Sequence, residues 1–152
     1  MRTNKFAHLA FFLLAALSMT GCGEKEDSTE PVNHNTYKLE KTTWEGTYNA
    51  PVEAPDGSTI PFTLQWTMEF ATDDSGLLLC DISSQVSQPQ SQEIAFTYSV
   101  DGSTGHFFVD GQEDTFCIDW SNNRISMDLQ IPIDIGTGRI VVGGMTNLYR
   151  IM

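Results

Sequence analysis

Side chains that could carry catalysis are few in this chain. Nucleophilic catalysis requires a nucleophile, a general base and a group that orients the base. Of the 3 histidines, His8 lies in an apolar N-terminal run and His34 lies in a polar stretch, which leaves His106. It stands between Gly105 and Phe107, with no recognisable nucleophile motif nearby. We therefore expect a histidine that faces solvent from a strand, no catalytic residues and no enzymatic activity.

Metal and disulfide chemistry also find little support. The acidic turn at residues 73–76 offers oxygen ligands, but it does not fit the twelve-residue calcium loop with its terminal Glu. Cys80 and Cys117 lack the histidine spacing of a zinc site. By strand parity Cys80 shares an apolar face with Leu78, whereas Cys117 shares a polar face with Asp119, so a disulfide between the two is disfavoured. We expect no metal site and no cofactor, and the sequence leaves the redox state of both thiols open.

The third cysteine, Cys22, has different surroundings. Arg2 and Lys5 precede an apolar run at residues 6–17, which is the pattern of a secretory signal peptide. This run is shorter than the roughly 20 residues of a membrane-spanning helix. Residues 19–22 (Met-Thr-Gly-Cys) resemble the bacterial lipobox, which implies that residues 1–21 are removed and that Cys22 is acylated, with palmitate among its acyl chains. The alternative is an ordinary signal peptide followed by an incidental cysteine.

The residues after Cys22 bear on where such a lipoprotein is displayed. Residues 23–27 (Gly-Glu-Lys-Glu-Asp) resemble the surface-export signal of Bacteroidota lipoproteins, and the alternative is a merely solvated segment. Residues 22–41 are polar and contain a proline, so they are predicted to form a lipidated flexible tether. Two or three acyl chains anchor a protein stably, because each buried methylene contributes about 0.8 kcal/mol. We expect an outer-membrane lipoprotein exposed at the cell surface, with the periplasmic face of that membrane as the alternative.

From residue 42 onward, apolar and polar residues alternate in short runs. Between Ile60 and Phe70 the pattern places six apolar side chains on one face of a strand. Turn signals such as Asp101-Gly102 and Asp110-Gly111 separate the runs. No helical period of comparable length occurs in the mature chain. Eight strands are predicted, at residues 43–50, 60–71, 76–86, 92–101, 104–110, 114–121, 124–135 and 139–151.

The short connections determine the expected architecture of residues 42–152. Strands that follow one another through hairpins favour an all-β, up-and-down meander barrel, which closes on itself and leaves no open edge. A two-sheet β-sandwich needs longer crossovers and is the alternative.

Four segments of this domain carry a family resemblance. They are similar to the lipocalin-like (calycin) domains of Bacteroidota lipoproteins: 43–48 (TWEGTY), 70–76 (FATDDSG), 96–100 (FTYSV) and 148–151 (LYRI). The resemblance implies a barrel in which a first-strand Trp packs under a basic residue of the last strand and closes one end. Trp44 and Arg150 match these residue types. A guanidinium above an indole contributes roughly 0.5–2 kcal/mol.

An eight-stranded barrel is just wide enough to be filled by side chains or to hold one small ligand. The predicted inward face carries five aromatic side chains, namely Tyr48, Trp66, Phe70, Tyr98 and Trp120. Rings with polar tips suit an amphipathic molecule, and the same rings also suit a dry core. We therefore expect a non-enzymatic binder of a small amphipathic ligand.

The charge of the chain restricts its partners. A formal net charge of −12 disfavours nucleic acid and anionic membrane surfaces, because both are bound through clustered Lys and Arg. The acidic residues Glu69, Asp119 and Asp128 are predicted on the outer face, where they could meet a basic protein. The second hypothesis is therefore a protein-interaction module, such as an inhibitor or an accessory subunit of an outer-membrane complex.

Overall fold

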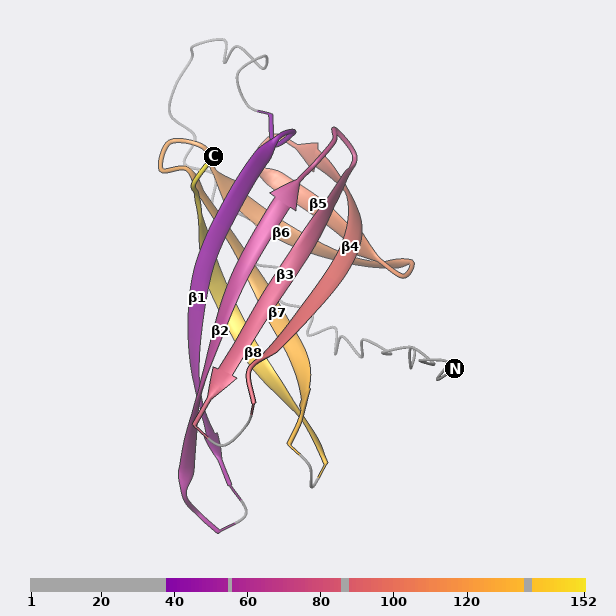
Figure 1. Ribbon diagram of the computed structural model, residues 1–152. Coiled ribbons are helices and arrows are strands. Elements are labelled where there is room, and N and C mark those ends of the chain that lie inside the picture. The colour runs from indigo at the N-terminus through magenta and orange to yellow at the C-terminus, as the bar shows by residue number, and fades with distance from the viewer. Residues whose placement is uncertain (1–37, 55, 86–87, 136–137) are drawn as a thin grey trace.

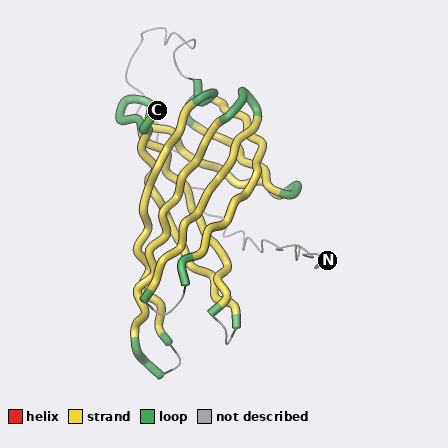
Figure 2. The backbone as a smooth tube through the Cα atoms, viewed as in Figure 1, coloured by secondary structure: helices red, strands yellow, loops and turns green. Residues whose placement is uncertain are grey.

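A computed structural model of the chain describes residues 38–54, 56–85, 88–135 and 138–152. The predicted signal peptide, Cys22 and most of the predicted tether lie outside these residues. The described residues form strands and loops without helices (Figure 2), and accordingly none of them belongs to an apolar helix long enough to cross a bilayer. The strands are β1 (Thr42–Glu53), β2 (Thr59–Phe70), β3 (Ser75–Ser84), β4 (Gln90–Asp101), β5 (Thr104–Val109), β6 (Gln112–Asp119), β7 (Arg124–Asp134) and β8 (Arg139–Arg150).

The strands form one closed barrel in sequence order (Figure 1). Each strand pairs antiparallel with the next, and β1 pairs antiparallel with β8. The short turns make this order possible: Asp110 and Gly111 both have positive φ, which is the conformation of the tightest hairpins. The predicted all-β meander barrel is confirmed, and the structure is not a β-sandwich.

Strand alternation places one continuous apolar core inside the barrel. On β2 the five side chains from Phe62 to Phe70 that share one parity are fully buried, whereas Gln65 and Glu69 between them are exposed. Burial of apolar surface stabilises such a core by about 25 cal/mol per Å². The period of two in the sequence thus sets which side of each strand faces inward.

The wall of the barrel is uneven in height. The β1–β2 and β7–β8 ladders run the length of their strands, whereas β6 meets β7 only where Cys117–Asp119 pair with Arg124–Ser126. On the other side of the β5–β6 hairpin, β4 pairs with β5 only from Thr97 onward. The short β5–β6 hairpin therefore completes the wall at one end of the barrel and not at the other.

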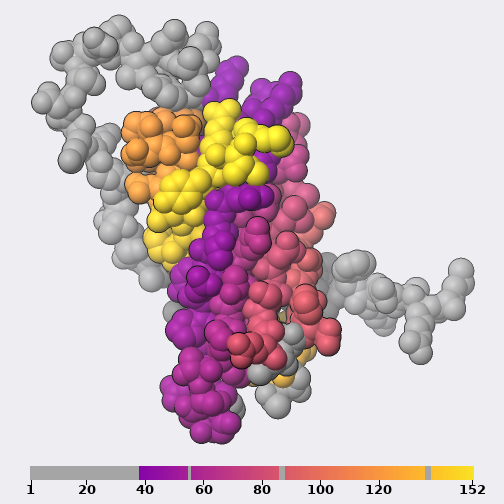
Figure 3. Space-filling view, turned by 60° about the vertical axis from the view of Figure 1, so that its left-hand side comes forward, coloured from indigo at the N-terminus to yellow at the C-terminus, as the bar shows by residue number. Residues whose placement is uncertain are grey.

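The seam between β1 and β8 joins the two ends of the described chain. Trp44 lies opposite Arg150, and the backbone N–H of Thr43 donates to the carbonyl of Met152 at 3.1 Å. The two strands approach so closely that a Cβ at Gly46 would lie 2.2 Å from the carbonyl oxygen of Asn147. Figure 3 shows β8 (yellow) beside β1 (indigo) on this face of the molecule.

Candidate functional site

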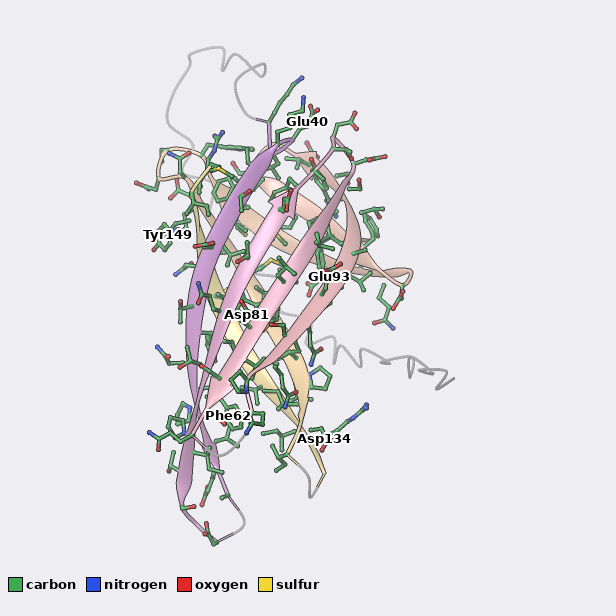
Figure 4. All side chains as sticks on the ribbon, viewed as in Figure 1. Glu40, Phe62, Asp81, Glu93, Asp134 and Tyr149 are labelled. Carbon is green, nitrogen blue, oxygen red and sulfur yellow. The ribbon has the colours of Figure 1, made fainter. Side chains whose placement is uncertain are left out.

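We call the end of the barrel where β1 begins and β8 finishes the capped end. Residues just before β1 fold over it: Lys41 N–H donates to the carbonyl of Phe70 at 2.7 Å, and Thr42 N–H donates to that of Leu39 at 3.0 Å. Leu39 is only 3% exposed and belongs to the core. Tight packing therefore begins before residue 42, within the segment predicted as tether. Glu40 is labelled at this end in Figure 4.

A cluster of aromatic rings fills the interior below this cap. It consists of Phe70, Phe96, Tyr98, Phe107 and Phe116. The rings of Phe70 and Tyr98 meet edge to face with centroids 4.8 Å apart, the geometry that aromatic pairs prefer. The Tyr98 hydroxyl donates to the carbonyl of Thr72 at 2.6 Å, and desolvation, followed by the nearby Asp73, raises the pKa of Tyr98 to about 12. Phe70 and Tyr98, both predicted as ligand contacts, thus pack against each other at the capped end.

The predicted closing pair lies at the seam of the same end. Trp44 is buried, and its Nε1 donates to Thr42 Oγ1 at 2.7 Å. Arg150 is directly opposite in the β1–β8 pairing, and its exposed side chain donates from Nε to the carbonyl of Met152 at 3.1 Å. The two residues therefore meet where the barrel closes, and stacking of the guanidinium on the indole stays a prediction.

The remaining predicted ligand contacts occupy two other places. Trp120 is partly buried at the rim of the capped end, where its Nε1 donates to the carbonyl of Gly102 at 3.1 Å. Tyr48 lies on the inner face of β1, and a Cβ at Gly144 would lie 2.7 Å from its hydroxyl. Because Tyr48 is paired with Leu64, it is a diagonal neighbour of Trp66 inside the barrel. The five predicted residues therefore do not form one site.

Halfway along the barrel, three inward side chains are neighbours on successive strands, and we call them the central row: Trp66 on β2, Cys80 on β3 and Gln92 on β4. Trp66 is 0% exposed, and its Nε1 has no hydrogen-bond partner among the described residues. Gln92 Nε2 donates across the interior to the carbonyl of Pro132 on β7 at 3.3 Å. The central row thus brings polar groups into an otherwise apolar interior.

The thiol in this row is not reactive. Cys80 is buried and free, and burial, followed by the charge of Asp81, raises its pKa to about 12. A thiol with such a pKa stays protonated at neutral pH, and the thiolate is the nucleophile. Cys117 lies on the opposite side of the wall, so the expectation that these two cysteines do not bond to each other is confirmed.

Beyond the central row lies the far end, where β1 passes into β2 and β7 passes into β8 (Phe62 and Asp134 mark it in Figure 4). The outermost inward apolar side chains of this end are only partly buried, in contrast to the aromatic cluster: Val52, Ile60, Ile135 and Ile140. The next inward residues, such as Phe62 and Ile133, are fully buried. Apolar side chains therefore reach solvent at the rim of this end, directly outside the fully buried core.

The outer surface carries the remaining titratable residues. His106 lies on the outer face of β5, where its Nδ1 is 2.5 Å from Glu113 Oε1. Glu69, Asp119 and Asp128 lie on three different strands, β2, β6 and β7. Hydrogen bonds from Asn122 and Ser121 lower the pKa of Asp119 to about 2. Within the described ranges, no three His, Cys, Asp or Glu side chains gather as metal ligands would.

Besides the buried Thr42 and Thr146, two further inward polar residues were not among the sequence predictions. Gln92 shares the parity of Ile94, and Asp114 shares the parity of Phe116, so strand alternation was the available signal for both. Asp114 lies opposite Phe107, and desolvation raises the pKa of its carboxyl. An acidic side chain therefore borders the interior in the part of β6 that does not pair with β7.

No family profile, curated protein or solved structure matches this chain. The closed eight-stranded meander is compatible with a lipocalin-like fold.

Proposed function

We propose that this protein is a lipid-anchored, non-enzymatic binding protein whose barrel takes up a small amphipathic molecule through the far end. The observation that carries this proposal is the contrast along the barrel axis. One end is capped by Leu39 and filled with packed rings, whereas the outermost inward apolar side chains of the other end are partly exposed. A ligand that enters from solvent would meet apolar walls first and the central row next.

The chemistry of these walls suits such a molecule. Binding sites for small molecules are lined mostly by apolar side chains with a few polar groups that fix orientation. Val52, Ile60 and Ile140 supply the apolar surface at the far end, and Trp66 and Tyr48 supply polar atoms deeper inside. The protonated thiol of Cys80 and the outward position of His106 support a binding role rather than a catalytic one.

The anchoring part of the proposal depends on the lipobox-like residues 19–22 and the acidic residues that follow them. We infer that Cys22 carries the acyl chains and that the barrel is displayed on the outer membrane at the cell surface, with its periplasmic face as the alternative. Metabolic labelling with an alkynyl palmitate analogue should label the protein. Cys22→Ser should abolish the label and Cys80→Ser should not. A processed protein without label would contradict the anchor.

Native mass spectrometry of the purified full chain tests the ligand. We expect a bound small molecule that is lost in the variant Ile60→Trp, because the larger ring fills the far end. Val141→Trp is the matched control, since Val141 is 64% exposed on the outer face of β8 and should leave the ligand bound. A protein that carries no small molecule and takes up none from a lipid extract would contradict the proposed function.

A protein-interaction module is the second candidate, and the outer face of β8 favours it. Among the described residues, five of the six exposed large apolar side chains lie on this strand or directly after it: Val141, Met145, Tyr149, Ile151 and Met152. Contiguous exposed apolar surface is typical of interaction sites. In pull-downs from intact cells, Met145→Glu should release a partner that Val100→Glu, on β4, retains. Equal recovery of every bound protein by both variants would contradict this candidate.

A further inference from the structure

The three tryptophans of the chain differ in whether the indole N–H has a hydrogen-bond acceptor. Trp44 Nε1 donates to Thr42 Oγ1 at 2.7 Å, and Trp120 Nε1 donates to the carbonyl of Gly102 at 3.1 Å. Trp66 is fully buried, and its Nε1 has no partner within the described part of the chain. A buried N–H without an acceptor costs free energy, because it has lost its hydrogen bond to water. The one indole left unsatisfied is the one nearest the middle of the barrel.

None of the polar side chains near Trp66 accepts a hydrogen bond from its Nε1. An indole N–H can only donate, so it needs an acceptor. The sulfur of the neighbouring Cys80 is only a weak acceptor. The amide nitrogen of Gln92 donates to Pro132, and its amide oxygen makes no hydrogen bond with Trp66 Nε1. Tyr48 adds a hydroxyl on the diagonal position. A ligand with an acceptor atom can therefore satisfy the N–H of Trp66, which has no partner among the residues that the structure describes.

Charge restricts this acceptor further. Four of the described lysines and arginines are exposed, namely Lys38, Lys41, Arg139 and Arg150. The fifth, Arg124, is partly buried and donates to Asp119 at 3.3 Å. No cation therefore faces the central row from the described strands, and the inward Asp114 would repel an anion. Burial of an unpaired ionised group is far more costly than burial of a neutral acceptor. These conditions favour an uncharged ligand.

We propose that Trp66 Nε1 is the polar recognition point of the barrel. The ligand is an uncharged apolar molecule with one hydrogen-bond acceptor, such as a ketone, ester or amide carbonyl. Its carbonyl accepts from Trp66, and its hydrocarbon part extends past Leu64 and Phe62 toward the far end. This inference depends on the proposed function, because it requires that a ligand enters the barrel.

The first test follows the indole resonances by NMR. The full chain, with ¹⁵N-labelled tryptophan, is titrated with 2-nonanone and separately with 1-nonene, which lacks the acceptor. We expect 2-nonanone to move the Trp66 indole proton downfield and 1-nonene not to do so, because hydrogen bonding deshields the donor proton. Trp44 and Trp120 are internal controls, since their indoles already have acceptors. The resonances are assigned with Trp→Phe variants.

The second test measures affinities, and it separates hydrogen bonding from packing. In Trp66→Phe the ratio of the Kd for 1-nonene to the Kd for 2-nonanone should fall about tenfold, because one hydrogen bond of ordinary strength is lost. The lost ring volume affects both probes alike, so it cancels from the ratio. Trp120→Phe should leave the ratio unchanged. Nonanoate should bind more weakly than 2-nonanone at neutral pH.

The outcomes distinguish the inference from the proposed function. If both probes bind but the Trp66 resonance and the Kd ratio do not respond, the recognition point is wrong and the binding function stands. If nonanoate binds as tightly as 2-nonanone, the uncharged class is wrong. If no probe binds and the purified chain carries no small molecule, both proposals are overturned.

Discussion

At the capped end, Leu39 and a cluster of five aromatic rings pack against one another, and backbone hydrogen bonds from Lys41 and Thr42 hold the cap in place. At the far end, aliphatic side chains such as Val52 and Ile60 are only partly buried. Between the two ends, Gln92 of the central row donates from its side chain to the carbonyl of Pro132 on β7. One barrel thus has an end that is capped and packed with rings and an end whose rim of apolar side chains is partly exposed. Under the proposed function, the capped end would provide stability and the far end would admit the ligand.

The largest effect that tests this contrast is expected from the aromatic cluster. Phe70→Ala should lower the free energy of unfolding by about 4 kcal/mol, because it leaves a cavity and removes edge-to-face ring contacts. Phe62→Ala, a matched change toward the far end, should cost about 3 kcal/mol, since the Phe62 ring lies outside the cluster. Urea unfolding of both variants measures the difference. Equal losses would show that the two ends contribute alike.

A smaller effect is expected at the seam. Gly46→Ala should destabilise the barrel by about 2 kcal/mol, because its Cβ would lie 2.2 Å from a backbone oxygen that cannot move aside. Gly144→Ala should cost less than about 1 kcal/mol, since its nearest neighbour is the Tyr48 hydroxyl at 2.7 Å, the tip of a side chain that can turn away. Thermal unfolding of the two variants provides the comparison. If Gly144→Ala lowered the stability more than Gly46→Ala did, the Tyr48 side chain would be unable to turn away, contrary to this prediction.

Asp114 should show a modest dependence on pH. Burial raises the pKa of its carboxyl in the folded state above the unfolded value near 3.9, so ionisation opposes folding. Asp114→Asn should therefore be more stable than the parent at pH 7, and the two stabilities should converge as the pH falls below 3.9. Urea unfolding at a series of pH values measures the convergence. A variant that is less stable at pH 7 would mean that the carboxylate has a stabilising partner.

The smallest effect is expected from Asp119, where removal of the charge should lower the stability at neutral pH rather than raise it. Its pKa is lowered to about 2 by hydrogen bonds from Asn122 and Ser121, so the ionised form stabilises the fold. This contribution is present above the unfolded pKa near 3.9 and is lost as the pH falls toward 2. Asp119→Asn should lose a small amount of stability at neutral pH and none at the acid limit. NMR titration of the carboxyl carbon checks the midpoint directly, and a value near 3.9 would contradict the hydrogen-bonded turn.

The period of two and the turn signals were sufficient to predict eight strands close to those observed, and the period predicted the inward faces of β2, β4, β6 and β7. The predicted end of β1 was wrong in an instructive way, because Pro51 did not end the strand at residue 50. Pro51 pairs with Pro61 at a height where β1 has no partner in β8, so its missing N–H leaves no ladder bond unmade. Which residues pair around the closed wall depends on the tertiary structure, and the alternation of apolar and polar residues along one strand does not specify it.

The inward parity of Trp66 and Phe70 was equally predictable, but their different surroundings were not. Which side chains meet inside a barrel depends on the stagger between strands, and the sequence pattern of single strands does not specify it. Leu39 was missed because it stands alone in a polar stretch, without the alternation that marked the other core residues. The unsatisfied N–H of Trp66 likewise has no sequence signal, since the same residue type is fully bonded at positions 44 and 120.

The seam at Trp44 and Arg150 also determines when this fold can be completed. As the chain is synthesised, β1 is among the first strands available, yet its partner β8 is the last. Until Arg150 to Met152 have been made, the two ends of the sheet cannot meet, and contacts so distant in sequence form slowly because a long loop must close. The nascent sheet therefore has two open edges until β8 is synthesised, and only then can it close into a barrel.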